Sequence, residues 1–175
     1  RALAPPIGAD RDGRAKLAPY ALRKLEASLY ASGFREEEVA VVPPEALDRA
    51  VGPDTAVLGL HVLDPLGLAP VSHTLRSLAG GGPSCTELFF LNLTKVLRPL
   101  KARYGFKLVV GGPGTWQLRP FRERLGIDCL VHGEGELVFP ELCRMALEGR
   151  DLPPEVDGGS VPVEKIPAIR GPSRS

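Results

Sequence analysis

Short apolar runs alternate along this chain with segments whose apolar residues recur at helical spacing. Runs bounded by glycine, proline or charged residues predict strands, and apolar residues three or four positions apart predict helices that bury one face. Strands are expected at residues 39–42, 55–63, 107–110 and 128–131. Helices are expected to run from near Pro19 to Gly33 and to cover residues 44–51, 71–78, 86–104, a part of 116–125, and 136–148.

This order of helices and strands predicts an α/β domain with a Rossmann-like, flavodoxin-type, doubly wound parallel sheet. The continuous apolar run at 55–63 is typical of a central parallel strand that is covered on both faces. The series begins with a helix, whereas this architecture usually places a strand before it. The first strand is therefore expected either to lie ahead of Arg1 or to be replaced by an irregular segment at residues 1–17.

Proline and glycine mark two further boundaries. Pro99 predicts a kink or an interruption in the helix at 86–104, and Gly105 is expected to end that helix. Residues 151–175 lack periodicity and are rich in proline and glycine, so they are expected to form an exit linker with one edge strand at 161–163. The predicted organisation is an irregular segment at 1–17, one α/β domain at 18–150 and a linker at 151–175.

Two glycine-containing loops follow neighbouring strands. Gly111-Gly112-Pro113-Gly114 comes after the strand at 107–110, and Gly133-Glu134-Gly135-Glu136 comes after the strand at 128–131. Parallel strands bring their carboxyl ends to one edge, where open α/β sheets bind ligands, and glycine allows the backbone to approach a ligand closely. The spacing matches neither G-x-G-x-x-G nor the P-loop pattern. The alternative is that both segments are only tight turns between a strand and a helix.

Other side chains near these loops are candidates for ligand contact. The carboxylates of Glu134 and Glu136 would repel a phosphate but could accept hydrogen bonds from amides, or could merely complement the dipole of a following helix. His61 could face the crevice or ligate a metal, or it could be a core histidine. The segment Asp64–Gly67 could wall a pocket, and Trp116 could do so or simply pack.

Composition narrows the class of protein. A formal net charge of +1 gives no electrostatic basis for binding nucleic acid or an anionic membrane, and no apolar run approaches the ~20 residues that span a bilayer. The three widely spaced cysteines indicate free thiols in a reducing compartment, so a cytoplasmic protein is expected. The sequence contains no zinc-binding spacing and no G-x-S-x-G nucleophile motif. No catalytic or metal-ligating residue is predicted.

The segments VVGGPGTW and GIDCLVHGEGELVFPEL, with a helix between them, resemble the amino-terminal cobalamin-binding domain of radical SAM proteins. In that family a glycine pair ends one strand, and a segment containing the GEGE sequence follows further along. The resemblance extends over about residues 19–150 and is strongest over 106–142. The residues that match the second segment are Ile127, Asp128, Val131, Gly133–Glu136, Phe139, Glu141 and Leu142.

The resemblance implies that cobalamin lies over the carboxyl ends of the strands, with its nucleotide tail beside the glycine pair. The family position corresponding to His61 is often a serine near that tail. The candidate cofactor contacts are His61, Asp64, Pro65, Leu66, Gly67, Gly111, Gly112, Pro113, Gly114, Trp116, His132, Gly133, Glu134, Gly135 and Glu136.

Two departures from the related domains limit the implied activity. Residues 1–17 lack the D-x-H-x-x-G pattern that supplies a lower axial histidine, and the chain lacks the C-x-x-x-C-x-x-C cluster motif. Residues 166–173 resemble the linker that precedes that motif. The resemblance therefore implies a module that is not catalytic by itself. Its partners would be cobalamin and the radical SAM barrel of the same parent chain, a methyltransferase or related enzyme that uses a 4Fe-4S cluster and S-adenosylmethionine.

Two other functions remain open from the sequence. The domain could bind another ligand, such as a nucleotide-sugar or a flavin. It could also be a degenerate domain that binds nothing and serves only as an interaction module.

Overall fold

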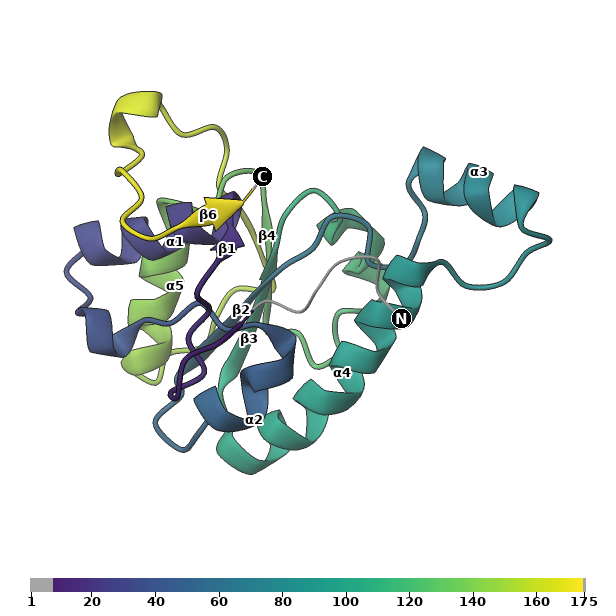
Figure 1. Ribbon diagram of the computed structural model, residues 1–175. Helices are drawn as coiled ribbons and strands as arrows, with labels where there is room; N and C mark the ends of the chain where they lie inside the picture. Colours follow the sequence, from purple (N-terminus) through teal and green to yellow (C-terminus); the bar gives the residue numbers. More distant parts are fainter. Residues whose placement is uncertain (1–7, 175) are drawn as a thin grey trace.

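The computed structural model describes residues 8–174 and has an α/β architecture with a four-stranded parallel sheet (Figure 1). The strands follow one another in the order β2-β3-β4-β5, and helices flank the sheet. This confirms the predicted Rossmann-like α/β fold. The strands are β2 (Val57–His61), β3 (Lys107–Gly111), β4 (Cys129–His132) and β5 (Glu155–Asp157).

The register of the sheet aligns the ends of its strands. His61 of β2 is opposite Gly111 of β3, which in turn is opposite Val131 of β4, and His132 is opposite Asp157 of β5. Because all four strands are parallel, the loops that leave them emerge at one edge. The positions that follow the predicted strands therefore come together.

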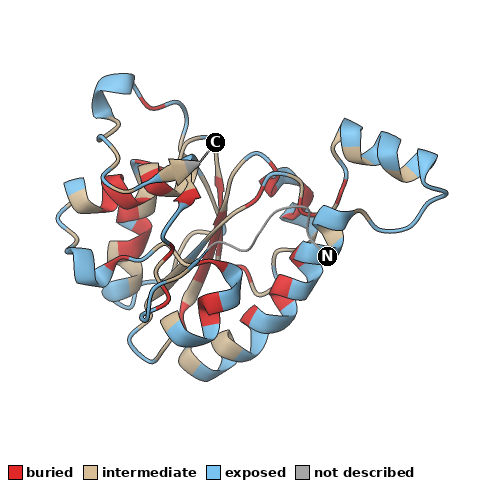
Figure 2. Ribbon diagram, in the orientation of Figure 1, coloured by how far each residue is buried: buried red, intermediate tan, exposed pale blue. Residues whose placement is uncertain are grey.

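Helices cover both faces of the sheet (Figures 1 and 2). On one face, α5 (Val138–Leu147) packs against alternate residues such as Val109 and Val131, and α1 (Tyr20–Ala31) contacts α5. On the other face, α2 (Leu47–Ala50) and α4 (Cys85–Tyr104) pack against Leu108 and Val110. Neighbouring residues of β3 thus point to opposite cores, as expected for a strand covered on both sides.

The long helix α4 has well-defined ends. The Ser84 hydroxyl accepts a hydrogen bond from the Glu87 amide at 3.1 Å, and Gly105 ends the helix with a φ of 74°. The prediction that Gly105 ends this helix is confirmed. The predicted interruption at Pro99 is wrong, because the helix continues through that residue to Tyr104. The preceding helix, α3 (Pro70–Leu78), agrees with the prediction for 71–78 and projects away from the sheet (Figure 1).

Two predicted elements are replaced by other conformations. Residues 39–42 do not form a strand of the sheet. Their backbone contact with another extended segment is the hydrogen bond from the Ala15 amide to the Val41 carbonyl, at 2.8 Å. The helix predicted within 116–125 is replaced by two 3-10 turns, η3 (Thr115–Gln117) and η4 (Arg119–Phe121). Pro120 lacks an amide hydrogen and is tolerated only near the start of a helical turn. It therefore lies near the start of the second turn, η4, and the segment does not form one continuous helix.

The carboxyl-terminal segment is part of the fold. Residues 151–175 were expected to be a linker, but they supply β5 and also β6 (Ser173–Arg174), which pairs in parallel with β1 (Ala18–Pro19). The strand predicted at 161–163 is wrong, since Pro162 cannot donate to a ladder and a 3-10 turn, η5 (Val163–Lys165), follows it.

The amino-terminal segment is described only in part. Of the irregular segment predicted at 1–17, residues 1–7 lie outside the described residues. Ala9 and Ala15 form an isolated antiparallel bridge in the rest of this segment.

The remaining elements are two short 3-10 turns, η1 (Glu36–Glu38) and η2 (Pro44–Ala46). None of the helices in residues 8–174 has both the length and the apolar character needed to cross a bilayer.

The three cysteines are predicted to react very differently. Cys85 is exposed, whereas burial raises the pKa of Cys129 to about 11 and that of Cys143 to about 12. Because the thiolate is the reactive form, only Cys85 should react rapidly with a disulfide reagent near pH 8 in the folded protein. All three should react after denaturation. Rapid reaction of a second thiol without unfolding would contradict the burial described here.

Candidate ligand-binding site at the carboxyl edge of the sheet

Three loops meet at the carboxyl edge of the sheet. They follow β2, β3 and β4 and contain the segments 62–67, 112–114 and 133–136. A cavity of about 1050 Å³ begins at this edge and extends along β2 between the flanking helices. Eight of the fifteen candidate residues line it, namely His61, Gly111, Gly112, Pro113, Gly133, Glu134, Gly135 and Glu136.

Two glycines of the first glycine loop are required by contacts within the protein. Gly112 has a φ of +105°, and a Cβ added there would lie 2.4 Å from the Val62 carbonyl oxygen. A Cβ at Gly114 would lie 2.5 Å from Pro65 Cδ, and the Gly114 amide donates to the Val62 carbonyl at 3.1 Å. The loops after β2 and β3 are therefore packed backbone against backbone.

Gly111 differs from these glycines. A Cβ added there would meet only Val131, at an ordinary contact distance of 3.7 Å, and the Gly111 φ is not positive. Gly111 also lines the cavity. Its missing side chain therefore leaves space in the cavity itself and is not needed for the folding of the loop.

His61 lies at the end of β2 and lines the cavity. It is half-buried, and its imidazole makes no hydrogen bond within residues 8–174. Burial lowers the pKa of His61 below its ordinary value of 6.5. The ring is consequently neutral near pH 7, and at least one ring nitrogen presents a lone pair to a ligand.

Both glutamates of the second glycine loop already have partners. Glu136 is 6% exposed and forms an ion pair with Lys24 of α1, with an Nζ–Oε1 distance of 2.5 Å. Hydrogen bonding to Glu136 raises the pKa of Lys24 above its ordinary value. The Glu134 carboxylate accepts a hydrogen bond from the Val161 amide. Each carboxylate has further acceptor capacity, so both can still receive an N–H from a ligand.

The segment after β5 holds the second glycine loop in place. The Glu134 amide donates to the Gly159 carbonyl at 3.0 Å, and the Gly158 amide donates to the His132 carbonyl at 2.8 Å. Gly133 has a φ of +74°, and a Cβ there would lie 2.6 Å from the Gly159 oxygen. The loop conformation is thus fixed by backbone bonds from a segment that the sequence assigns to a linker.

The candidate residues after β2 form a closed turn outside the cavity lining. The Asp64 carboxylate accepts hydrogen bonds from the Leu68 and Ala69 amides and from Gln117, at 2.7–3.0 Å. Burial tends to raise the pKa of Asp64, but hydrogen bonding from the Ser72 and Gln117 side chains and from these two amides outweighs it and lowers the pKa below its ordinary value. Asp64 therefore stabilises the loop that contains Pro65, Leu66 and Gly67.

His132 and Trp116 also lie outside the cavity lining. His132 Nδ1 is 3.2 Å from the Thr115 hydroxyl, and its Nε2 is 3.2 Å from a Glu155 carboxylate oxygen. This histidine bridges η3 and β5. Trp116, in η3, is 56% exposed and presents an apolar ring to solvent next to the glycine loop.

Sequence reasoning missed the walls of the cavity. They come from α1 and α5, which contribute Leu22, Leu25, Leu29, Phe139 and Cys143, and from residues 39–42. One signal was available, since Gly59 interrupts a strand and a mid-strand glycine often marks close approach by another group. A Cβ at Gly59 would lie 2.8 Å from the Phe139 ring.

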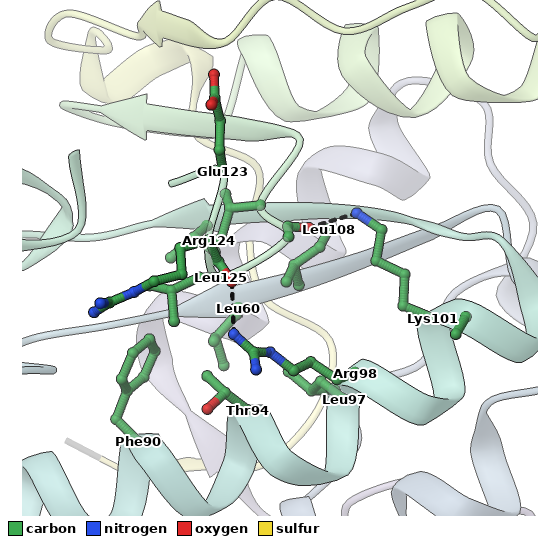
Figure 3. Close-up of a pocket in the computed structure, with 14 residues that line it drawn as sticks. Leu60, Phe90, Thr94, Leu97, Arg98, Lys101, Leu108, Glu123, Arg124 and Leu125 are labelled. Atoms are coloured by element: carbon green, nitrogen blue, oxygen red, sulfur yellow. Dashed lines mark hydrogen bonds between the residues drawn. The ribbon is translucent and has the colours of Figure 1, made fainter. Parts of the chain in front are cut away.

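A second, smaller cavity lies on the α4 side of the sheet (Figure 3). It has a volume of about 380 Å³ and is lined by apolar residues such as Phe90, Leu97 and Leu125. Arg98 donates to the Arg124 carbonyl at 2.6 Å across its rim. None of the candidate contacts lines this cavity.

Comparison of the chain with protein families, with curated proteins and with solved structures finds no match. Within the described residues, no group of three or more His, Cys, Asp or Glu side chains is placed to hold a metal ion. The site is therefore defined by its own geometry: apolar walls, an open glycine, a neutral imidazole and two carboxylates in the cavity lining.

Replacing Glu134 tests how the second glycine loop is held. In E134A the buried Val161 amide loses its acceptor, which should lower the free energy of unfolding by about 1–3 kcal/mol. E134Q keeps a side-chain oxygen acceptor and should lose less. Urea denaturation of the three proteins measures this order, and equal losses in E134A and E134Q would contradict the proposed bond.

The stability of the protein should depend on His61 below about pH 6.5. Because the folded-state pKa of His61 is lowered, the unfolded chain binds a proton more readily, so protonation favours unfolding as the pH falls through this window. H61Q removes this contribution and should show a shallower loss of stability between neutral and acidic pH than the wild type. Unfolding curves at several pH values test this, and parallel pH profiles would contradict it.

Proposed function

We propose that this domain binds cobalamin at the carboxyl edge of its sheet, as the cofactor-binding module of a radical SAM enzyme such as a methyltransferase. The observation that carries the proposal is the meeting of the two glycine loops over one cavity, which Gly111 leaves open and which His61 lines. A large ligand can then lie over the edge and insert one narrow part between the helices.

The walls of the cavity fit the nucleotide tail of cobalamin. Leu22 and Leu25 of α1 and Phe139 of α5 line the cavity and present apolar surface, which suits the apolar base of that tail. The His61 ring lies close to Gly112, with its Nε2 3.0 Å from the position of an added Cβ. His61 is thus placed to contact a group that enters beside the glycine pair.

The second glycine loop in the cavity lining fits the periphery of the corrin, which carries amide groups. Glu134 and Glu136 can accept hydrogen bonds from amide N–H donors there. The same two carboxylates would repel a phosphate group, and Lys24, which lies beside Glu136, is already paired with it. Cobalamin carries a single phosphodiester charge in its tail, less charge than the phosphate of FMN or the diphosphate of a nucleotide-sugar, so this arrangement favours cobalamin over those two ligands.

When bound, cobalamin would supply a methyl group or serve as a redox partner. The residues of this chain would bind and orient the cofactor. The loops after β2, β3 and β4 are held by hydrogen bonds within the protein, so little ordering is needed when a ligand arrives. The apolar walls would exclude water from the inserted part.

Incubation with hydroxocobalamin followed by desalting tests the proposal. The wild type should retain the visible absorption of the corrin, and binding should quench the fluorescence of Trp116, the sole tryptophan. G111L places a large side chain in the cavity and should raise the Kd by about tenfold or more, whereas G111A should bind nearly as well as the wild type.

The matched control is G8L, because Gly8 is exposed, lies outside the cavity and has room for a side chain. It should bind like the wild type. Parallel incubations with FMN and UDP-glucose test the alternative ligands. A colourless wild-type protein, or retention of either of these compounds in place of cobalamin, contradicts the proposal.

A further inference from the structure

The smaller cavity, on the α4 face of the sheet, is separate from the candidate site at the carboxyl edge. It has a volume of about 380 Å³, and its rim carries exposed residues of α4 and of the segment 123–124 (Figure 3). Among the described residues, only Leu60 and Leu97 line both cavities. A ligand could therefore bind here without using the glycine loops.

The connection between β3 and β4 explains why space remains on this face. In a doubly wound fold a helix normally covers the sheet between successive strands. Here η3, η4 and the turns at residues 122–126 take its place. On the facing side, Ala102 of α4 lines the cavity with only a methyl group. The turns and α4 therefore leave a gap between them.

The walls of the cavity are apolar and buried. They include Phe90, Leu97, Leu108, Leu125 and Ile127, each of which is 9% exposed or less. Packed interiors contain few voids larger than a water molecule, and an empty apolar void of this size destabilises a fold. An apolar group that enters from solvent would fill the space and gain contact with these side chains.

Thr94 is the polar side chain within these walls, and it does not require a polar partner. It is 9% exposed, and its hydroxyl donates to the Leu91 carbonyl of its own helix at 2.9 Å. The charged residues of the lining are at the rim (Figure 3). The part of a ligand that enters the cavity is therefore apolar.

Two arginines place positive charge at the rim. Arg98 reaches across it and donates to the Arg124 carbonyl at 2.6 Å, which uses one of the five N–H donors of its guanidinium (Figure 3). The Arg124 guanidinium lies 4.7 Å from the centre of the Phe121 ring. Within residues 8–174 neither arginine forms an ion pair, so both charges are available to an anion.

The other charged groups beside the rim do not cancel this charge. Lys101 is already paired with Asp128, and Glu123 is paired with Arg122 at 3.2 Å. The Glu123 side chain is 88% exposed, so solvent screens its charge. The two rim arginines remain in excess.

We propose that this cavity binds an amphipathic monocarboxylate, such as a medium-chain fatty acid, with its apolar body between α4 and the sheet and its carboxylate at Arg98. The guanidinium fork matches the two oxygens of a carboxylate. A doubly charged phosphate would meet more repulsion from Glu123, which lines the rim. This inference does not rest on the binding of cobalamin.

The volume of the cavity sets the size of the ligand. An apolar cavity of about 150 Å³ can hold benzene, so a cavity of about 380 Å³ has room for on the order of 10 to 15 non-hydrogen atoms. Octanoate is within this range and is a suitable probe. Octanol has a chain of the same length without the charge.

Titration with octanoate in the absence of cobalamin, followed by amide NMR, tests the proposal. We expect saturable binding with a Kd of about 1 mM or lower. The largest shifts should be at Arg98, Leu125 and Ile127, which line only this cavity. Absence of saturation, or shifts confined to Leu25 and Phe139 of the larger cavity, overturns the proposal.

R98Q tests recognition of the carboxylate separately from the fit of the chain. It should raise the Kd of octanoate by about fivefold or more and leave that of octanol unchanged. R103Q is the matched control, because Arg103 is an exposed residue of α4 outside the cavity, and it should bind octanoate like the wild type. An unchanged Kd of octanoate in R98Q contradicts the proposal.

Two further measurements keep the test decisive if R98Q also disturbs the rim. Raising NaCl from about 20 to 500 mM should weaken octanoate binding to the wild type and should not weaken octanol binding. A102F places a ring at the mouth and should raise the Kd of both ligands by about tenfold. A salt-independent Kd for octanoate, or unchanged binding in A102F, overturns the assignment. Because no cobalamin is present, failure here is distinguishable from failure of the proposed function.

Discussion

The in-register parallel pairing of β2, β3 and β4 is the constraint on which the site depends. It aligns His61, Gly111 and Val131 across three strands, so the loops that follow these residues all emerge at the carboxyl edge of the sheet. Asp128 strengthens this register, because its carboxylate accepts a hydrogen bond from the Leu108 amide at 2.6 Å and pairs with Lys101 of α4. Any ligand that this edge binds is recognised by residues far apart in sequence.

The glycines at this edge serve two different purposes. Gly112, Gly114 and Gly133 allow neighbouring loops to pack backbone against backbone, and side chains there would collide with carbonyls or with the Pro65 ring. Gly111 has no such neighbour and instead leaves part of the cavity open. The first group gives the edge its rigid shape, and Gly111 determines how much space remains for a ligand.

Much of the fold could be predicted from the sequence, because β3, β4 and α4 carry strong local signals. Continuous apolar runs mark the two strands, and Gly105 marks the end of the helix. β5 was missed because Glu155–Asp157 contains one apolar residue and follows two prolines. The strand expected at 39–42 is not formed, because a strand also needs a neighbour and none pairs with this segment among residues 8–174. The Lys24–Glu136 pair joins distant segments and leaves no local signal.

The most direct test of the account is to map the amides that hydroxocobalamin protects from exchange in this domain. Binding at the carboxyl edge should protect the loops at residues 111–114 and 133–136 and the first turns of α1, which carry Leu22, Lys24 and Leu25. The α4 side around Arg98 and Leu125, which line the smaller cavity and not the larger one, should be unaffected. Absence of protection at the two glycine loops, or protection confined to the α4 side, would contradict the claim that the carboxyl edge binds cobalamin.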